Sequence, residues 1–128
     1  MKAKHFVIFT LVMLLFVGCA SLKSLSTEEK IVAAYVTAGE SMSAIHSTWK
    51  VLREEGKAND EQNTKFNELF NKAKEIYRVM GNTEILILTA VTKTEKDGYI
   101  IQFNEIAAKL PEILQDINSL ISLVKGGK

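Results

Sequence analysis

The sequence contains little of what disulfide-bonded, cofactor-binding or catalytic proteins usually need. It has one cysteine, one proline and two histidines among 128 residues. A single cysteine excludes a disulfide within the chain, so the fold must be stabilised by burial of apolar side chains. No phosphate-binding loop, dinucleotide fingerprint or calcium loop is present. We therefore expect no cofactor and no catalytic residues, and we predict that the protein is not an enzyme.

An excess of charge of one sign is also lacking. Lysine and arginine number 16 and aspartate and glutamate 15, without a basic block. Nucleic acid is therefore not an expected partner. One proline, few glycines and abundant lysine, glutamate, leucine, isoleucine and alanine are typical of helical proteins.

The N-terminal residues have the layout of an export signal. Residues 1–5 are basic, residues 6–17 are apolar except for Thr10, and Gly18 precedes the only cysteine, Cys19. The apolar run is shorter than the roughly 20 residues needed to cross a bilayer, which argues against a transmembrane helix. A plain secretory signal is the remaining alternative, and the position of Cys19 favours lipidation.

The residues Phe16-Val17-Gly18-Cys19 resemble the end of a bacterial lipoprotein signal. The family usually has leucine where Phe16 stands, with Leu15 here one place earlier. The resemblance implies a diacylglyceryl group on the Cys19 thiol and cleavage before that residue. It also implies anchoring in the cell membrane or outer membrane, with the domain facing the periplasm or the cell exterior. Residues 1–18 are then the signal peptide and residues 19–25 the lipidated N-terminus and tether.

Residues 26–128 are predicted to form one helical domain, because the 110 residues that follow the signal suffice for a single modest core. Ser26 and Glu29 predict a capping box at the start of a first helix, which Gly56 would end. Apolar side chains recur along it in steps of three and four, the spacing of a bundle helix. They are Ile31, Tyr35, Ala38, Met42, Ile45, Trp49 and Leu52.

A second helix is predicted from Asn59 or Asp60 to a turn at Asp97-Gly98. The apolar spacing passes through Gly81 without a phase change, which favours a continuous helix, since one glycine costs only about 1 kcal/mol. A break near Gly81 would give a fourth helix. A β-hairpin at residues 85–101 is the minor alternative, indicated by Asp97-Gly98 between apolar runs.

A third helix is predicted from the apolar positions Phe103, Ile106, Leu110, Ile113, Ile117, Leu120 and Val124. Pro111 lies inside this pattern, where a kink is favoured over a break because the phase is unchanged. The predicted fold is therefore all-α, an antiparallel three-helix bundle, with four helices if the second one breaks.

Candidate functional residues are few. Trp49, Phe70 and Tyr77 are spaced as core residues, and only an exposed subset would mark a partner surface. His46 has no second histidine or free thiol to complete a metal site, so no metal is expected. Ser43 and Ser47 lie near it without an oxyanion-hole loop. Glu84 interrupts an otherwise apolar row and is the carboxylate of most interest.

The segment Lys65–Tyr77 with Gly81-Asn82 resembles small helical lipoproteins of bacterial and prophage genomes, a type without an established activity. The sequence favours a membrane-anchored protein-interaction module acting on an envelope protein. A structural linker to peptidoglycan is the alternative, because Lys128 is similar in position to the terminal lysine of the murein lipoprotein. A small-molecule-binding protein or enzyme is the least favoured class, since a short compact bundle has little room for a cleft.

Overall fold

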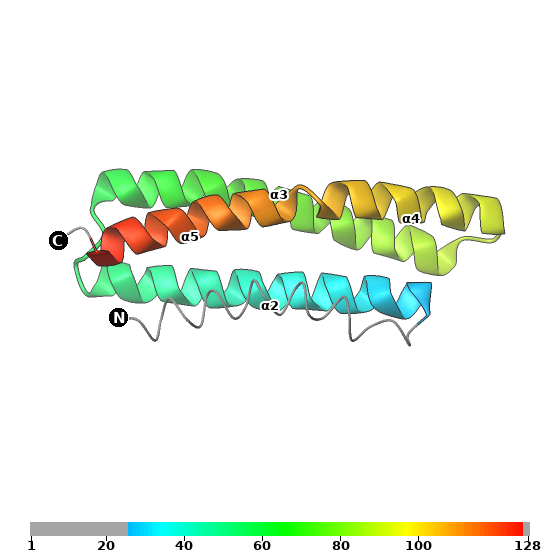
Figure 1. Cartoon of the computed structure of the whole chain (residues 1–128), viewed down its shortest axis with the longest axis horizontal. Coiled ribbons are helices and arrows are strands. Elements are labelled where there is room, and N and C mark those ends of the chain that lie inside the picture. Colours follow the sequence, from blue (N-terminus) through cyan, green and yellow to red (C-terminus); the bar gives the residue numbers. More distant parts are fainter. Residues whose placement is uncertain (1–25, 127–128) are drawn as a thin grey trace.

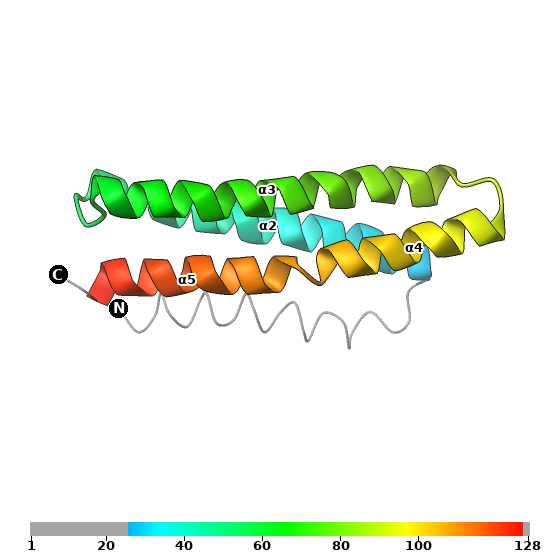
Figure 2. The same ribbon diagram turned by 90° about the horizontal axis from the view of Figure 1, so that it is seen from above.

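The computed structural model describes residues 26–126 as four helices. These are α2 (Thr27–Glu54), α3 (Asp60–Thr89), α4 (Lys93–Ala107) and α5 (Leu110–Gly126). Figures 1 and 2 show α4 and α5 following each other along one line beside α2 and α3, so the fold is the predicted all-α antiparallel three-helix bundle. The predicted signal peptide, Cys19, the tether and Lys128 lie outside the described residues.

The predicted starts of the first two helices are confirmed by their caps. Ser26 Oγ accepts from the Glu29 amide at 3.2 Å, and Glu29 Oε1 accepts from the Ser26 amide at 3.2 Å. Asn59 forms the same reciprocal pair with Gln62, at 2.8 and 2.9 Å. Gly56 follows the end of α2 with a φ of 71°, a left-handed conformation that glycine adopts without strain.

Helix α3 is continuous through Gly81, as predicted, but it ends at Thr89 rather than near Asp97-Gly98. The predicted turn at Asp97-Gly98 is therefore wrong, because both residues lie inside α4. Thr92 caps α4 by accepting from the Glu95 amide at 3.2 Å. The β-hairpin alternative is also excluded, since residues 85–101 are helical apart from the short connection after Thr89.

The predicted kink at Pro111 is also wrong, because the chain breaks into two helices just before this residue. Helix α4 ends at Ala107, and the amide of Lys109 bonds to the Ile106 carbonyl at 3.1 Å in a tighter turn. Pro111 then occupies the first turn of α5, where its missing N–H would have had no helical partner. The apolar spacing keeps its phase across the break, so α4 and α5 continue one face.

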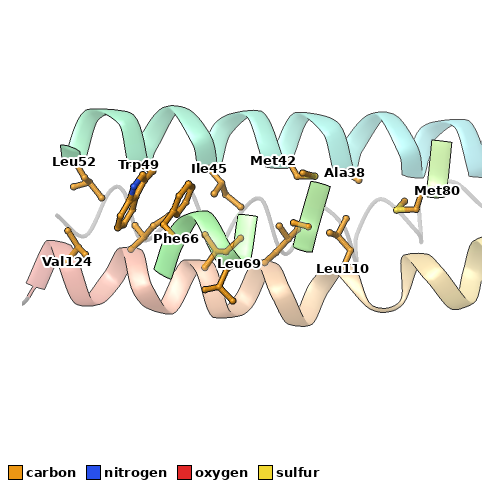
Figure 3. Packing of buried hydrophobic residues seen from close by; sticks show 14 of the residues in the cluster. Ala38, Met42, Ile45, Trp49, Leu52, Phe66, Leu69, Met80, Leu110 and Val124 are labelled. Carbon is orange, nitrogen blue, oxygen red and sulfur yellow. The ribbon is translucent and has the colours of Figure 1, made fainter. Parts of the chain in front are cut away.

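The core runs the length of the bundle and draws on all four helices. Figure 3 shows its side chains from α2 meeting those from α3 and α5. The most completely buried large side chains are Phe66, Phe103, Leu52, Met80, Ile87, Ile117 and Ile121. The start of α2 lies at the same end of the bundle as the α3–α4 connection, and the end of α5 lies at the opposite end (Figures 1 and 2).

Candidate functional site

Trp49 belongs to the core, which removes it from the candidate partner surface. Its side chain is 4% exposed and its ring stacks on Phe66, with centroids 4.5 Å apart and planes 2° apart. The indole Nε1 donates to Asn63 Oδ1 at 2.9 Å, so its one polar group is satisfied. Trp49 therefore fixes the contact between α2 and α3 near their shared loop.

Phe70 is half-buried and lies between the core and the surface. Its ring is 5.3 Å from that of Phe66 on the inner side and 5.4 Å from that of His46 on α2. Lys74 Nζ is 5.9 Å from the Phe70 centroid, within the range of a cation–π contact. His46 itself is exposed and packs against an aromatic ring.

Tyr77 stacks on Tyr35 of α2, with centroids 4.3 Å apart and planes 7° apart. Each ring also covers a glycine of the opposite helix. A Cβ on Gly39 would lie 2.5 Å from Tyr77 Oη, and a Cβ on Gly81 would lie 2.6 Å from Tyr35 Oη. These distances are too short for a side chain unless the tyrosine moves, so the close approach of Tyr35 accounts for the mid-helix glycine at position 81.

The two contacts are reciprocal. Each helix contributes a tyrosine followed four residues later by a glycine, Tyr35 with Gly39 and Tyr77 with Gly81. Because the helices are antiparallel, each tyrosine meets the other helix's glycine. We call the residues Tyr35, Gly39, Phe70, Tyr77 and Gly81 the α2–α3 seam. The repeated spacing is visible in the sequence, but composition alone does not show that the two pairs face each other.

Glu84 lies near Tyr77 on α3 and is half-buried. Its Oε2 is buried without a hydrogen-bond partner among the described residues. Burial raises the pKa of this carboxyl above its ordinary value, because water is lost around the charged form. Burial also raises the pKa of Tyr77 to about 12, with Tyr35 and the negative charge of Glu84 acting in the same direction.

Ser43, Ser47 and His46 do not come together as a reaction centre in the part of the chain that the structure describes. Ser43 and Ser47 are exposed on α2, like His46, and no side-chain hydrogen bond links any of the three within residues 26–126. Within the same range, no group of three or more His, Cys, Asp or Glu residues could hold a metal ion. No helix there is long and apolar enough to cross a bilayer. What the seam offers is an aromatic surface.

Comparison of the chain with protein-family models, curated proteins and solved structures finds no match.

Proposed function

We propose that this protein is a membrane-anchored lipoprotein whose helical bundle binds another protein of the cell envelope. The observation that supports it best is the α2–α3 seam, where Phe70 and Tyr77 remain half-buried after the core is complete. Aromatic side chains of this kind contribute much of the energy of protein interfaces. The lipoprotein-type sequence before Ser26 would hold that surface next to a membrane.

The anchor is tested by replacing Cys19 with serine in the full-length protein. We expect the variant to lose metabolic labelling by palmitate and lipid-dependent processing, because serine offers no thiol to acylate. Continued labelling of the serine variant would contradict the anchor, as would an unlipidated native protein in the culture supernatant.

The interaction surface is tested by crosslinking the lipidated protein in its native envelope. A stoichiometric protein partner should be recovered with the native chain and lost with Phe70→Ala combined with Tyr77→Ala. Val51→Ala is the matched control, because Val51 is 43% exposed and lies outside the seam. His46→Ala should keep the partner, since the aromatic surface remains. Finding no partner, together with turnover of a small molecule that depends on His46 or Glu84, would contradict the proposal.

A linker to peptidoglycan is the second candidate, favoured by the positions of the two ends of the bundle. The end of α5 lies opposite the start of α2 (Figure 2). Helix α3 has 30 residues and is therefore about 45 Å long, which gives the scale of the bundle. A chain anchored before Ser26 would thus present its C-terminal end away from the membrane. Mass spectrometry of digested cell wall should detect a peptidoglycan fragment on Lys128 if this function holds.

A further inference from the structure

Four consecutive apolar residues near the end of α3 cover all sides of about one helical turn, although only one side is buried. In the run Ile85-Leu86-Ile87-Leu88, Ile87 is 0% exposed and packs in the core. The other three are 59%, 42% and 46% exposed, and Val91 in the following connection is 92% exposed. We call Ile85, Leu86, Leu88 and Val91 the apolar tip. A helix with apolar residues all round is normally covered on all sides, so the tip lacks a partner.

The apolar tip lies at the end of the bundle where the chain enters it. Figures 1 and 2 show the α3–α4 connection at the same end of the bundle as the first turn of α2 and projecting beyond that turn. In the proposed mature protein, residues 19–25 join the lipidated cysteine to Ser26. Seven residues span at most about 25 Å when fully extended. The membrane that holds the lipid would therefore lie within about 25 Å of Ser26, at the end of the bundle that carries the apolar tip.

Both lysines next to the apolar tip are paired with carboxylates. Lys93 Nζ pairs with Asp97 at 3.0 Å, and Lys96 pairs with Glu28 of α2. The second pair also ties the start of α4 to the start of α2. Lysines that are already paired attract anionic groups only weakly, so contact of the tip with a partner would depend on burial of apolar area.

We propose that the apolar tip lies against the lipid surface of the membrane that carries the anchor, with Leu88 and Val91 below the headgroups. This inference rests on the proposed lipid anchor at Cys19. The tip orients the bundle with its long axis away from the membrane, which leaves the α2–α3 seam accessible from the side. Because the contact is apolar, it is independent of the anionic lipid content.

The test uses the full-length lipidated protein reconstituted in vesicles of phosphatidylethanolamine and phosphatidylglycerol at 3:1, and separately in phosphatidylcholine. A nitroxide is attached at Val91→Cys, and in a matched control at Asn67→Cys, an exposed position near the other end of α3. Collision with oxygen, which partitions into lipid, is compared with collision with a water-soluble nickel chelate. We expect the oxygen-to-nickel ratio to be several-fold higher at position 91, equally in both vesicle types. Circular dichroism checks that both labelled proteins fold.

The outcomes separate the inference from the anchor on which it rests. Co-flotation with vesicles, together with equal ratios at positions 91 and 67, would overturn the tip contact and leave the anchor intact. Spin–spin broadening at position 91 that disappears on dilution with unlabelled protein would place a second copy on the tip and also overturn it. Failure to co-float would overturn the anchor and the tip contact with it.

Discussion

Helices α2 and α3 are joined by two aromatic stacks of nearly the same geometry in different surroundings. Trp49 and Phe66 stack at 4.5 Å in the core, where both rings are at most 4% exposed. Tyr35 and Tyr77 stack at 4.3 Å but remain half-buried. The first pair contributes burial of large apolar area. The second contributes less burial, yet its close fit against two glycines restricts how the two helices can be aligned. Burial and alignment are thus supplied by different parts of one interface.

Removing the buried stack should have the largest effect. Trp49→Ala deletes a fully buried ring and leaves a cavity beside Phe66, which we expect to lower the free energy of unfolding by about 3–5 kcal/mol. Urea unfolding followed by circular dichroism measures this change. Tryptophan fluorescence cannot be used, because the variant lacks the only tryptophan of the chain. Tyr35→Ala should cost clearly less, because its ring is partly solvated. Equal costs for the two variants would remove the distinction between the stacks.

A methyl group placed in the tyrosine–glycine contact should have the next largest effect. Gly39→Ala gains about 1 kcal/mol of helix propensity but forces Tyr77 to move, at a cost of about 1–3 kcal/mol, so we expect net destabilisation. Gly98→Ala is the matched control, because a Cβ there meets nothing within 4 Å. It should stabilise the protein by up to about 1 kcal/mol.

Gly39→Ala in a Tyr77→Phe background tests whether the Tyr77 hydroxyl causes the destabilisation. The hydroxyl is the nearest atom to the added Cβ, so its removal should recover part of the loss. If Gly39→Ala and Gly98→Ala stabilise equally, the tyrosine does not constrain the helix approach.

Alkaline pH should weaken the tyrosine stack and spare the tryptophan stack. The pKa of Tyr77 is raised to about 12 in the folded protein, against 10.0 for an ordinary tyrosine. Between these values the folded state holds a proton that the unfolded state has released, so stability falls as pH rises from 10 through 12. The free energy of unfolding should fall more steeply over this window in the native protein than in Tyr77→Phe. Parallel slopes would contradict the assignment.

The smallest expected effect belongs to Glu84. Its pKa is raised by burial, so the folded protein favours the protonated carboxyl and loses stability as pH rises above the ordinary glutamate range. Glu84→Gln should therefore be more stable than the native protein at pH 7, and the difference should disappear in acid, where both folded and unfolded carboxyls are protonated. Thermal unfolding at pH 4 and pH 7 measures it, and a difference that persists unchanged at pH 4 would point to packing instead.

Local signals predicted the starts of α2 and α3 and most core positions, but not the starts of α4 and α5 or every helix end. The caps at Ser26 and Asn59 depend on residues three apart, and the sequence shows them directly. The end of α3 is different, because apolar residues continue past Thr89 to Val91, which is 92% exposed. The periodicity therefore extends beyond the buried region, and the cap at Thr92 decided the boundary. The break before Pro111 was hidden for the same reason, since the apolar phase persists across it.

The candidate surface could be predicted only in part. Spacing placed Phe70, Tyr77 and Trp49 on the inner side of their helices, and burial then separated Trp49 from the other two. The pairing of Tyr35 with Gly81 depends on the alignment of two helices whose contacts are far apart in sequence. A single sequence does not contain that alignment, because many helix offsets bury similar apolar area.

The reciprocal tyrosine–glycine contact restricts how this molecule could change its length. One residue added to α2 between Gly39 and Trp49 would rotate one stack about 100° relative to the other, so that only one could still form. Seven residues correspond to about two helical turns, and added to both α2 and α3 they would keep both stacks aligned. Helices α4 and α5 are already separated by a turn at Ala108 and Lys109, which could accommodate an insertion of matching length. Related chains, if longer or shorter in this region, should therefore differ by matched insertions in two helices.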